Sequence, residues 1–400
     1  MKLNTATAPS FLTLLLLIAF ASANAVLFTP ALPSITEFFH VSTSAGQQTI
    51  TWFLIGYAVG QLLYGPLASR FGRKWALYAG IYLQIFSSLI CVFAGTVHVF
   101  GILIIGRFLL ALGSGVGLKM TFTIINEYYE PKAASEKVSY LMLAFAVTPS
   151  LAVTLGGLLT LHYGWTSCFY AGAVYGLLLL LAVARLPNAA TPLNRNALQM
   201  QHLIHSYASQ FKNIPLITGG LLMGCTTSFV YVFAASAPFI AMNLLGMNSA
   251  EYGFANMLPP IGLITGSLVS AQLIKSYSLL TLIRIGIILS SLGAGLMLLA
   301  MLFHLSALLS LFLPMIVLYL GLCFILPNAS SIAMSSTDDK AHGSAVMNFI
   351  NMGLTTVVVL MLGFFPMTSF LLPLFALTIC VVMLGLFNII VRFGFADKIA

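Results

Sequence analysis

The chain of 400 residues is 60% hydrophobic and only 6% charged, which excludes an ordinary soluble protein, because soluble domains carry roughly a quarter charged residues. The net charge of +8 does not indicate a nucleic-acid partner, because the basic residues fall in short loops between apolar runs and form no basic patch. Apolar runs of about 18 to 25 residues recur along the chain, each long enough to cross a membrane as a helix. The sequence therefore predicts an all-α protein that crosses a membrane many times.

The first apolar run resembles a signal peptide, since it follows Lys2 and contains the small residues Ala21, Ser22 and Ala23. It continues to Phe28, which is long enough to span, and an even number of spans requires it, so we expect it to be retained. In chain order we expect about twelve spans, at residues 9–30, 47–69, 75–96, 101–126, 137–160, 166–186, 215–240, 252–274, 279–302, 306–330, 343–365 and 369–392.

The lysines and arginines lie on one side of these spans. Of the 16, all but Arg107 and Lys119 fall in loops or at span ends that alternate to the same side. The positive-inside rule then predicts a multi-pass protein of the bacterial inner membrane with both termini in the cytoplasm. The five cysteines are dispersed in apolar segments without metal-ligand spacing, so we expect buried thiols and neither a metal nor another cofactor.

A hydrophilic stretch divides the spans into two groups. We expect a first half at residues 1–187, a cytoplasmic linker at 188–214 and a second half at 215–400. A weak internal repeat supports this division, because GPLASRFGRK after the second span corresponds, about 205 residues later, to SAQLIKSYSL after the eighth, with Lys275 in the place of Arg70. Two six-helix repeats around a central path are typical of secondary transporters.

Six segments in chain order carry a family resemblance: GQLLYGPLASRFGRK (60–74), GRFLLALGSGVG (106–117), TPSLAVTLGG (148–157), APF (237–239), LPNA (326–329) and HGSAVMNFINMG (342–353). Together they resemble the major facilitator superfamily and, within it, the Bcr/CflA group of bacterial drug-resistance transporters. The resemblance implies a monomer in membrane lipid that moves a small molecule by alternating access, coupled to protons in the manner of a drug exporter.

Three positions depart from the family pattern. Ser69 stands where the loop motif has an aspartate, so it supplies no charge to a gate. Val26 stands where the group has an aspartate on the first helix, which removes the usual proton-binding carboxylate. Val153 replaces the second proline of the fifth-helix antiporter motif, which keeps Pro149, Gly156 and Gly157 as the candidate hinge.

Arg107 and Lys119 are the most informative residues, because a charge inside a span must face protein or water. Arg107 is expected either to bond to the first helix or to contact substrate directly. Lys119 lies about 18 Å further along the helix. It faces either the cavity or, by extending its side chain, the membrane interface. If both cations line the cavity, the site is positive, since no span has a deeply placed Asp or Glu.

Other polar residues mark helix faces. Ser344, Asn348, Asn351 and Thr355 follow a helical spacing, as do Tyr57, Gln61 and Tyr64, and each set indicates either a cavity wall or a hydrogen-bonded helix seam. The family geometry would add further residues to the path. The full set of candidate substrate-binding residues is Arg107, Lys119, Asn24, Phe28, Tyr57, Gln61, Thr227, Tyr231, Asn348 and Asn351.

A gate is expected at the cytoplasmic end. Arg70, Arg73 and Lys74 could pair with Glu127, Asp338 and Asp339 across the halves, and such pairs would bias two nearly equal conformations. Alternatively, these cations only set the topology.

The sequence favours a transporter over an intramembrane enzyme, because it has no HExxH and its histidines fall almost wholly at loops and span ends. Arg107, Lys119 and the missing acid favour an anionic carboxylate metabolite or a siderophore. The resemblance alone favours proton-coupled multidrug export, and we keep it as the alternative.

Overall fold

The structure is a computed structural model that describes residues 9–129, 131–186, 207–337 and 340–392. These residues form helices and turns, with no strand among them. Eleven helical stretches in the described chain are long and apolar enough to cross a membrane. Another helix, α7 (Pro131–Tyr163), runs unbroken over 33 residues and brings the set to about twelve. The predicted all-α membrane fold is confirmed.

Two spans of the first half are interrupted. The first passes from α1 (Phe11–Val26) through the 3₁₀ turn η1 (Thr29–Ala31) into α2 (Leu32–Phe38), because Pro30 and Pro33 lack the N–H that would continue one helix. The span therefore extends beyond the expected end at residue 30. The fourth span changes at Gly115 from α5 (Phe100–Ser114) to α6 (Val116–Tyr128). The remaining helices of this half are α3 (Thr43–Phe71), α4 (Arg73–Val97) and α8 (Thr166–Ala184).

The second half is interrupted at a different place. The eighth span breaks before Pro259, where proline suits the first position of the next helix, whereas its counterpart in the repeat, the second span, is the single helix α3. The elements are α10 (Ile214–Phe239), η2 (Ile240–Leu244), α11 (Ser249–Ala255), α12 (Pro259–Leu273), α13 (Leu279–Leu302), η3 (Leu308–Phe312), α14 (Leu313–Ser335), α15 (Lys340–Leu362) and α16 (Leu371–Arg392).

Left-handed turn residues recur at matching places in the two halves. His40, after the first span, and Gly246, after the seventh, both have positive φ (52° and 75°). His98, after the third span, and His304, after the ninth, do so as well (53° and 51°). Both pairs lie 206 positions apart (40 to 246 and 98 to 304). A left-handed residue ends a helix by redirecting the chain, so the same helix ends are closed in both halves. This agrees with the repeat seen in the sequence.

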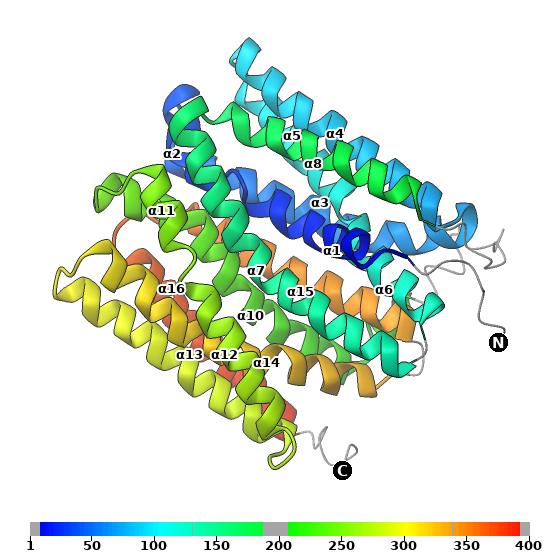
Figure 1. Cartoon of the computed structure of the whole chain (residues 1–400). Helices are drawn as coiled ribbons and strands as arrows, with labels where there is room; N and C mark the ends of the chain where they lie inside the picture. The colour runs from blue at the N-terminus through cyan, green and yellow to red at the C-terminus, as the bar shows by residue number, and fades with distance from the viewer. Residues whose placement is uncertain (1–8, 130, 187–206, 338–339, 393–400) are drawn as a thin grey trace.

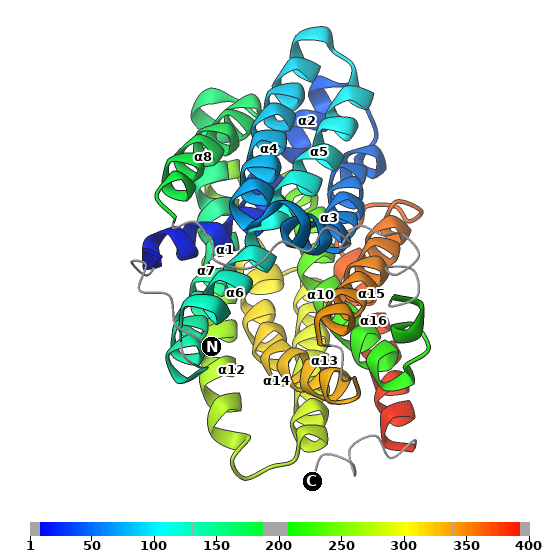
Figure 2. The same cartoon turned by 90° about the vertical axis from the view of Figure 1, so that its right-hand side faces the viewer.

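The two groups of helices lie side by side (Figure 1). The outer flank of the first group carries α4 and α8, and the outer flank of the second carries α13 and α16 (Figure 1, Figure 2). Between the flanks, α3 packs on α15 and α7 packs on α11. The halves therefore meet along two helix pairs.

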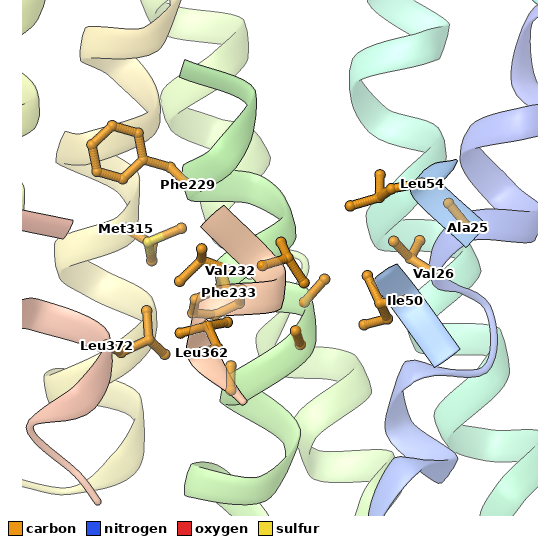
Figure 3. Close-up of a cluster of buried hydrophobic side chains, with 14 of the residues drawn as sticks. Ala25, Val26, Ile50, Leu54, Phe229, Val232, Phe233, Met315, Leu362 and Leu372 are labelled. Carbon is orange, nitrogen blue, oxygen red and sulfur yellow. The ribbon is translucent and has the colours of Figure 1, made fainter. Parts of the chain in front are cut away.

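The apolar interior has two parts. One cluster, from Leu14 to Leu186, draws all its buried members from the first half. The larger cluster crosses between the halves. Figure 3 shows Val26, Ile50 and Leu54 of the first half facing Val232 and Phe233 of α10. Val26, which stands in the place of the family aspartate, is therefore an apolar contact residue at the interface.

Candidate functional site

Arg107 caps the broken end of the first span. Its Nη1 donates to the Asn24 carbonyl (3.0 Å), its Nη2 to the Ala25 carbonyl (3.2 Å) and its Nε to the Thr49 carbonyl (3.4 Å). The last carbonyls of a helix lack donors from their own helix, and the guanidinium fork supplies them to Asn24 and Ala25. Of the two alternatives, the structure therefore has Arg107 bonded to the first helix.

Two aromatic rings pack against this guanidinium. Its Cζ lies 3.9 Å from the ring centre of Phe28 and 4.5 Å from that of Phe53, and Arg107 is only 1% exposed. The negative faces of two rings and three carbonyl dipoles thus surround the cation. Phe28, predicted to contact substrate, packs on Arg107 and is itself buried.

A polar network lies behind Arg107 within the first half. Gln84 Nε2 is 3.0 Å from each of three acceptors, namely Asn24 Oδ1, Ser88 Oγ and the Gly172 carbonyl. The Asn24 amide also donates to the Phe20 carbonyl (2.8 Å). A cavity with space for about one water molecule adjoins this network and Arg107. The Asn24 side chain therefore serves the packing of α1 on α4 and α8.

Lys119 points at the backbone of α3. Its Nζ lies 3.4 Å from the Gln61 carbonyl, and its terminal atoms occupy the space that a Cβ on Gly65 would need. The side chain is half-buried. The sequence left open whether this amine faces the cavity or the interface. In the structure it lies in a groove that Gly65 leaves on α3.

Buried tyrosines from both halves interact electrostatically with one another. Tyr57 of α3 lies within electrostatic range of Tyr231 on α10. Tyr231 is in turn within range of Arg107, and Tyr319 of α14 is within range of both Tyr231 and Tyr252 of α11. Tyr57 and Tyr231 were among the predicted residues. Tyr252 and Tyr319 were missed, although a tyrosine inside an apolar span is a visible signal.

The tyrosine cluster, defined as Tyr57, Tyr231, Tyr252 and Tyr319, joins the halves. α11, which carries Tyr252, packs on η1 of the first half. Three of the four side chains are at most 7% exposed, and Tyr231 is half-buried. The cluster offers hydroxyl groups and aromatic faces without an acidic side chain.

One end of the polar stripe on α15 is buried against α10. The Thr355 hydroxyl donates to the Asn351 carbonyl (2.9 Å) and lies 3.2 Å from the Gly224 carbonyl of α10. Asn351 is 3% exposed, and its Oδ1 has no hydrogen-bond partner among the described residues. Asn348 is half-buried, and Thr227 of α10 is buried. This end of the stripe is thus a helix seam, in keeping with one of the two alternatives.

The predicted cytoplasmic gate is described only in part. Lys74 Nζ donates to the Ala184 and Leu186 carbonyls (2.9 and 3.1 Å), where a cation suits the end of α8. The Arg70 guanidinium lies over the Phe71 ring, and Arg73 is 8% exposed. The Glu127 side chain and residues Asp338 and Asp339 lie outside the described part, so pairing across the halves stays a prediction.

The candidate hinge residues lie in close packing. α7 continues through Pro149 without a break. A Cβ on Gly156 would collide with the Leu27 carbonyl, and one on Gly157 would collide with the Ser249 carbonyl of the other half. These glycines bring backbones together at helix crossings. Their role as a hinge stays a prediction.

In the described residues, four hydrogen bonds between the halves lie at the end without cationic loops. They run from Ser44 to the Gly363 carbonyl, Gln47 to Ala235, Thr154 to Gly253 and Ser249 to Gly157. At the opposite end, the Tyr207 hydroxyl lies 3.4 Å from the Leu62 carbonyl, which Pro66 leaves without its helical donor. The described part of the chain therefore joins the two halves by buried hydrogen bonds at the cation-free end.

Comparisons with known proteins agree with this architecture. The family model of the Major Facilitator Superfamily matches residues 14–357. Multidrug resistance protein D of Escherichia coli is 26% identical over 329 residues, which cover 81% of this chain and 80% of that protein. The bicyclomycin resistance protein homolog of Haemophilus influenzae is 23% identical over 320 residues, covering 78% and 77%. The resemblance to the Bcr/CflA group is thereby confirmed.

A solved structure extends the comparison. The crystal structure of a D-xylose-proton symporter matches with a TM-score of 0.76 over 93% of this chain and 96% of that chain. The two sequences are 15% identical, so this likeness concerns the fold alone.

Proposed function

This chain belongs to the major facilitator superfamily, and we propose that it exports small, uncharged amphipathic compounds from a bacterial cell by alternating access. The protein is a multi-pass membrane transporter of small molecules and not an enzyme. The proposal places it in the inner membrane as a monomer, with both termini in the cytoplasm and protons as the coupled ion.

The surroundings of Arg107 carry the proposal. The guanidinium donates to three carbonyls, packs against the rings of Phe28 and Phe53 and is 1% exposed. A cation held in this way has little left to offer a substrate carboxylate. Arg107 therefore gives little support to an anionic cargo.

The tyrosine cluster supports the uncharged class. Hydroxyls and aromatic faces from α3, α10, α11 and α14 suit a compound with an apolar body and a few hydrogen-bonding groups. The names of the relatives point the same way, since two of them are resistance proteins.

An anionic cargo, either a carboxylate metabolite or a siderophore, remains the second candidate. One observation favours it: the Lys119 amine is half-buried beside α3, where it donates to the Gln61 carbonyl and not to a carboxylate. A substrate carboxylate could pair with this amine.

Transport by the purified protein in liposomes tests the proposal. Three labelled probes should be compared under an imposed pH gradient: bicyclomycin as the uncharged compound, citrate as the polycarboxylate and tetraphenylphosphonium as the lipophilic cation. We expect the uptake rate of bicyclomycin to exceed that of liposomes without protein, and the uptake rate of citrate to equal it. Citrate transport that is lost in Lys119→Ala would instead establish the anionic candidate.

A further inference from the structure

Two hydroxyl groups form reciprocal hydrogen bonds between α7 and α11. The Thr154 hydroxyl of α7 lies 2.8 Å from the Gly253 carbonyl of α11, and the Ser249 hydroxyl of α11 lies 3.2 Å from the Gly157 carbonyl of α7. All these groups are buried, at the end of the bundle without cationic loops. Each helix thus donates one hydroxyl to a glycine carbonyl of the other half.

The glycines make this contact possible. A Cβ on Gly157 would collide with the Ser249 carbonyl, and one on Gly253 would lie 3.1 Å from the Thr154 Cα. Only with hydrogen at these positions do the backbones approach closely enough for a short hydroxyl side chain to reach across.

The start of α11 holds Ser249 in place. The Asn248 side chain accepts from the Glu251 N–H (2.9 Å), and the Glu251 carboxylate accepts from the Asn248 N–H (2.8 Å). This capping box fixes the first turn, in which Ser249 is the first residue. The serine is therefore presented to α7 by a rigid helix end.

Thr154 has a second acceptor available within its own helix. Its hydroxyl also lies 2.9 Å from the Ser150 carbonyl, and a hydroxyl has a single hydrogen to donate. When the halves separate, this hydrogen can return to Ser150 and the donor is not left unpaired. The bond across the halves can therefore break at low cost, as a part that opens in every cycle requires.

We propose that Thr154 and Ser249 form a reversible latch, which holds the cation-free end shut and sets the population of the conformation open on that side. The proposal rests on alternating access as proposed above, but not on the identity of the substrate. Because two such bonds are weak compared with the whole interface, the latch adjusts the balance of two conformations without locking either.

Cysteine accessibility tests the latch without any substrate. Ile50, 2% exposed and facing the second half on α3, serves as the reporter through Ile50→Cys (Figure 3). A membrane-impermeant maleimide is added outside right-side-out vesicles, and the rate of the same chain without Ile50→Cys is subtracted. In this background we compare Thr154→Val, Ser249→Ala and the double variant.

Loss of one bond is expected to raise the labelling rate about five-fold, and loss of both up to about thirty-fold, since each hydrogen bond contributes a modest net stabilisation. Thr148→Val is the matched control, because that hydroxyl bonds to the Ala144 carbonyl of its own helix (2.7 Å) and should leave the rate unchanged. Thr154→Ser keeps the hydroxyl and should restore slow labelling, which separates the latch from misfolding.

Unchanged labelling in the double variant would overturn the proposal. Equal acceleration by Thr148→Val would do so too, because the effect would then be a general loosening of α7. Neither outcome depends on whether bicyclomycin or citrate is the cargo, so failure of the latch and failure of the proposed substrate remain distinguishable.

Discussion

Arg107 donates its Nη1 to the Asn24 carbonyl across 3.0 Å, and the Asn24 side chain in turn accepts from Gln84, so one residue links the buried cation to the polar network. The break in the first span, the buried cation and the packing of α4 thus form one polar unit. A change in any member should be felt by the others.

Replacing Arg107 tests this unit. Arg107→Lys keeps the charge but loses the planar fork that reaches two carbonyls and packs against two rings. We expect the free energy of unfolding to fall by about 2 kcal/mol or more, because buried carbonyls lose their donors. Thermal unfolding in detergent measures the effect. Arg185→Lys, at an exposed position after α8, is the control and should be near neutral.

Alanine substitutions should distinguish glycines that lie at helix crossings from a glycine with open space around it. Gly157→Ala should push α7 away from Ser249 and speed labelling at Ile50→Cys, whereas Gly156→Ala should disturb α7 against Leu27 and lower thermal stability. Gly295→Ala of α13 meets no atom within 4 Å and should stabilise its helix by up to about 1 kcal/mol. If all three variants behave alike, close packing does not explain the first two.

Lys119 separates the two substrate classes. Under the proposed function, Lys119→Met should leave bicyclomycin transport within about two-fold of the reference, because an uncharged cargo gains little from the amine. Lys119→Arg should likewise transport it. Uptake rates in liposomes provide the measurement, and a loss of bicyclomycin transport in Lys119→Met with retention in Lys119→Arg would show that the positive charge is required.

The tyrosine cluster should determine affinity for hydrogen-bonding cargo. Tyr231→Phe and Tyr319→Phe keep the rings and remove the hydroxyls, so KM for bicyclomycin should rise about three- to ten-fold while the maximal rate changes less. Tyr140→Phe, at an exposed position on α7, should have no effect. A KM that is unaltered in both cluster variants would remove these hydroxyls from the binding site.

The fold was largely predictable, because span length and the placement of cations are local properties of the sequence. The extent of the first span was not. The sequence suggested an end near Pro30, but prolines suit the first turn of a new helix, and α2 continues to Phe38.

The site was less predictable, because it depends on which face of each helix meets which neighbour. The sequence allowed Arg107 to face either the first helix or a substrate, and only the tertiary structure brings the end of α1 against the middle of α5. Gln84 was overlooked, although a carboxamide inside an apolar span signals a buried partner. Tyr252 and Tyr319 lie on two different helices of the second half, so their proximity becomes visible only once α11 and α14 are packed.

The apolar cluster from Leu14 to Leu186 lies wholly within residues that precede the predicted linker. The first half thus contains an apolar cluster to which the second half contributes no buried side chain. Separately synthesised fragments, cut between the two groups of spans, should on this basis insert independently and reassociate in the bilayer into a working pair.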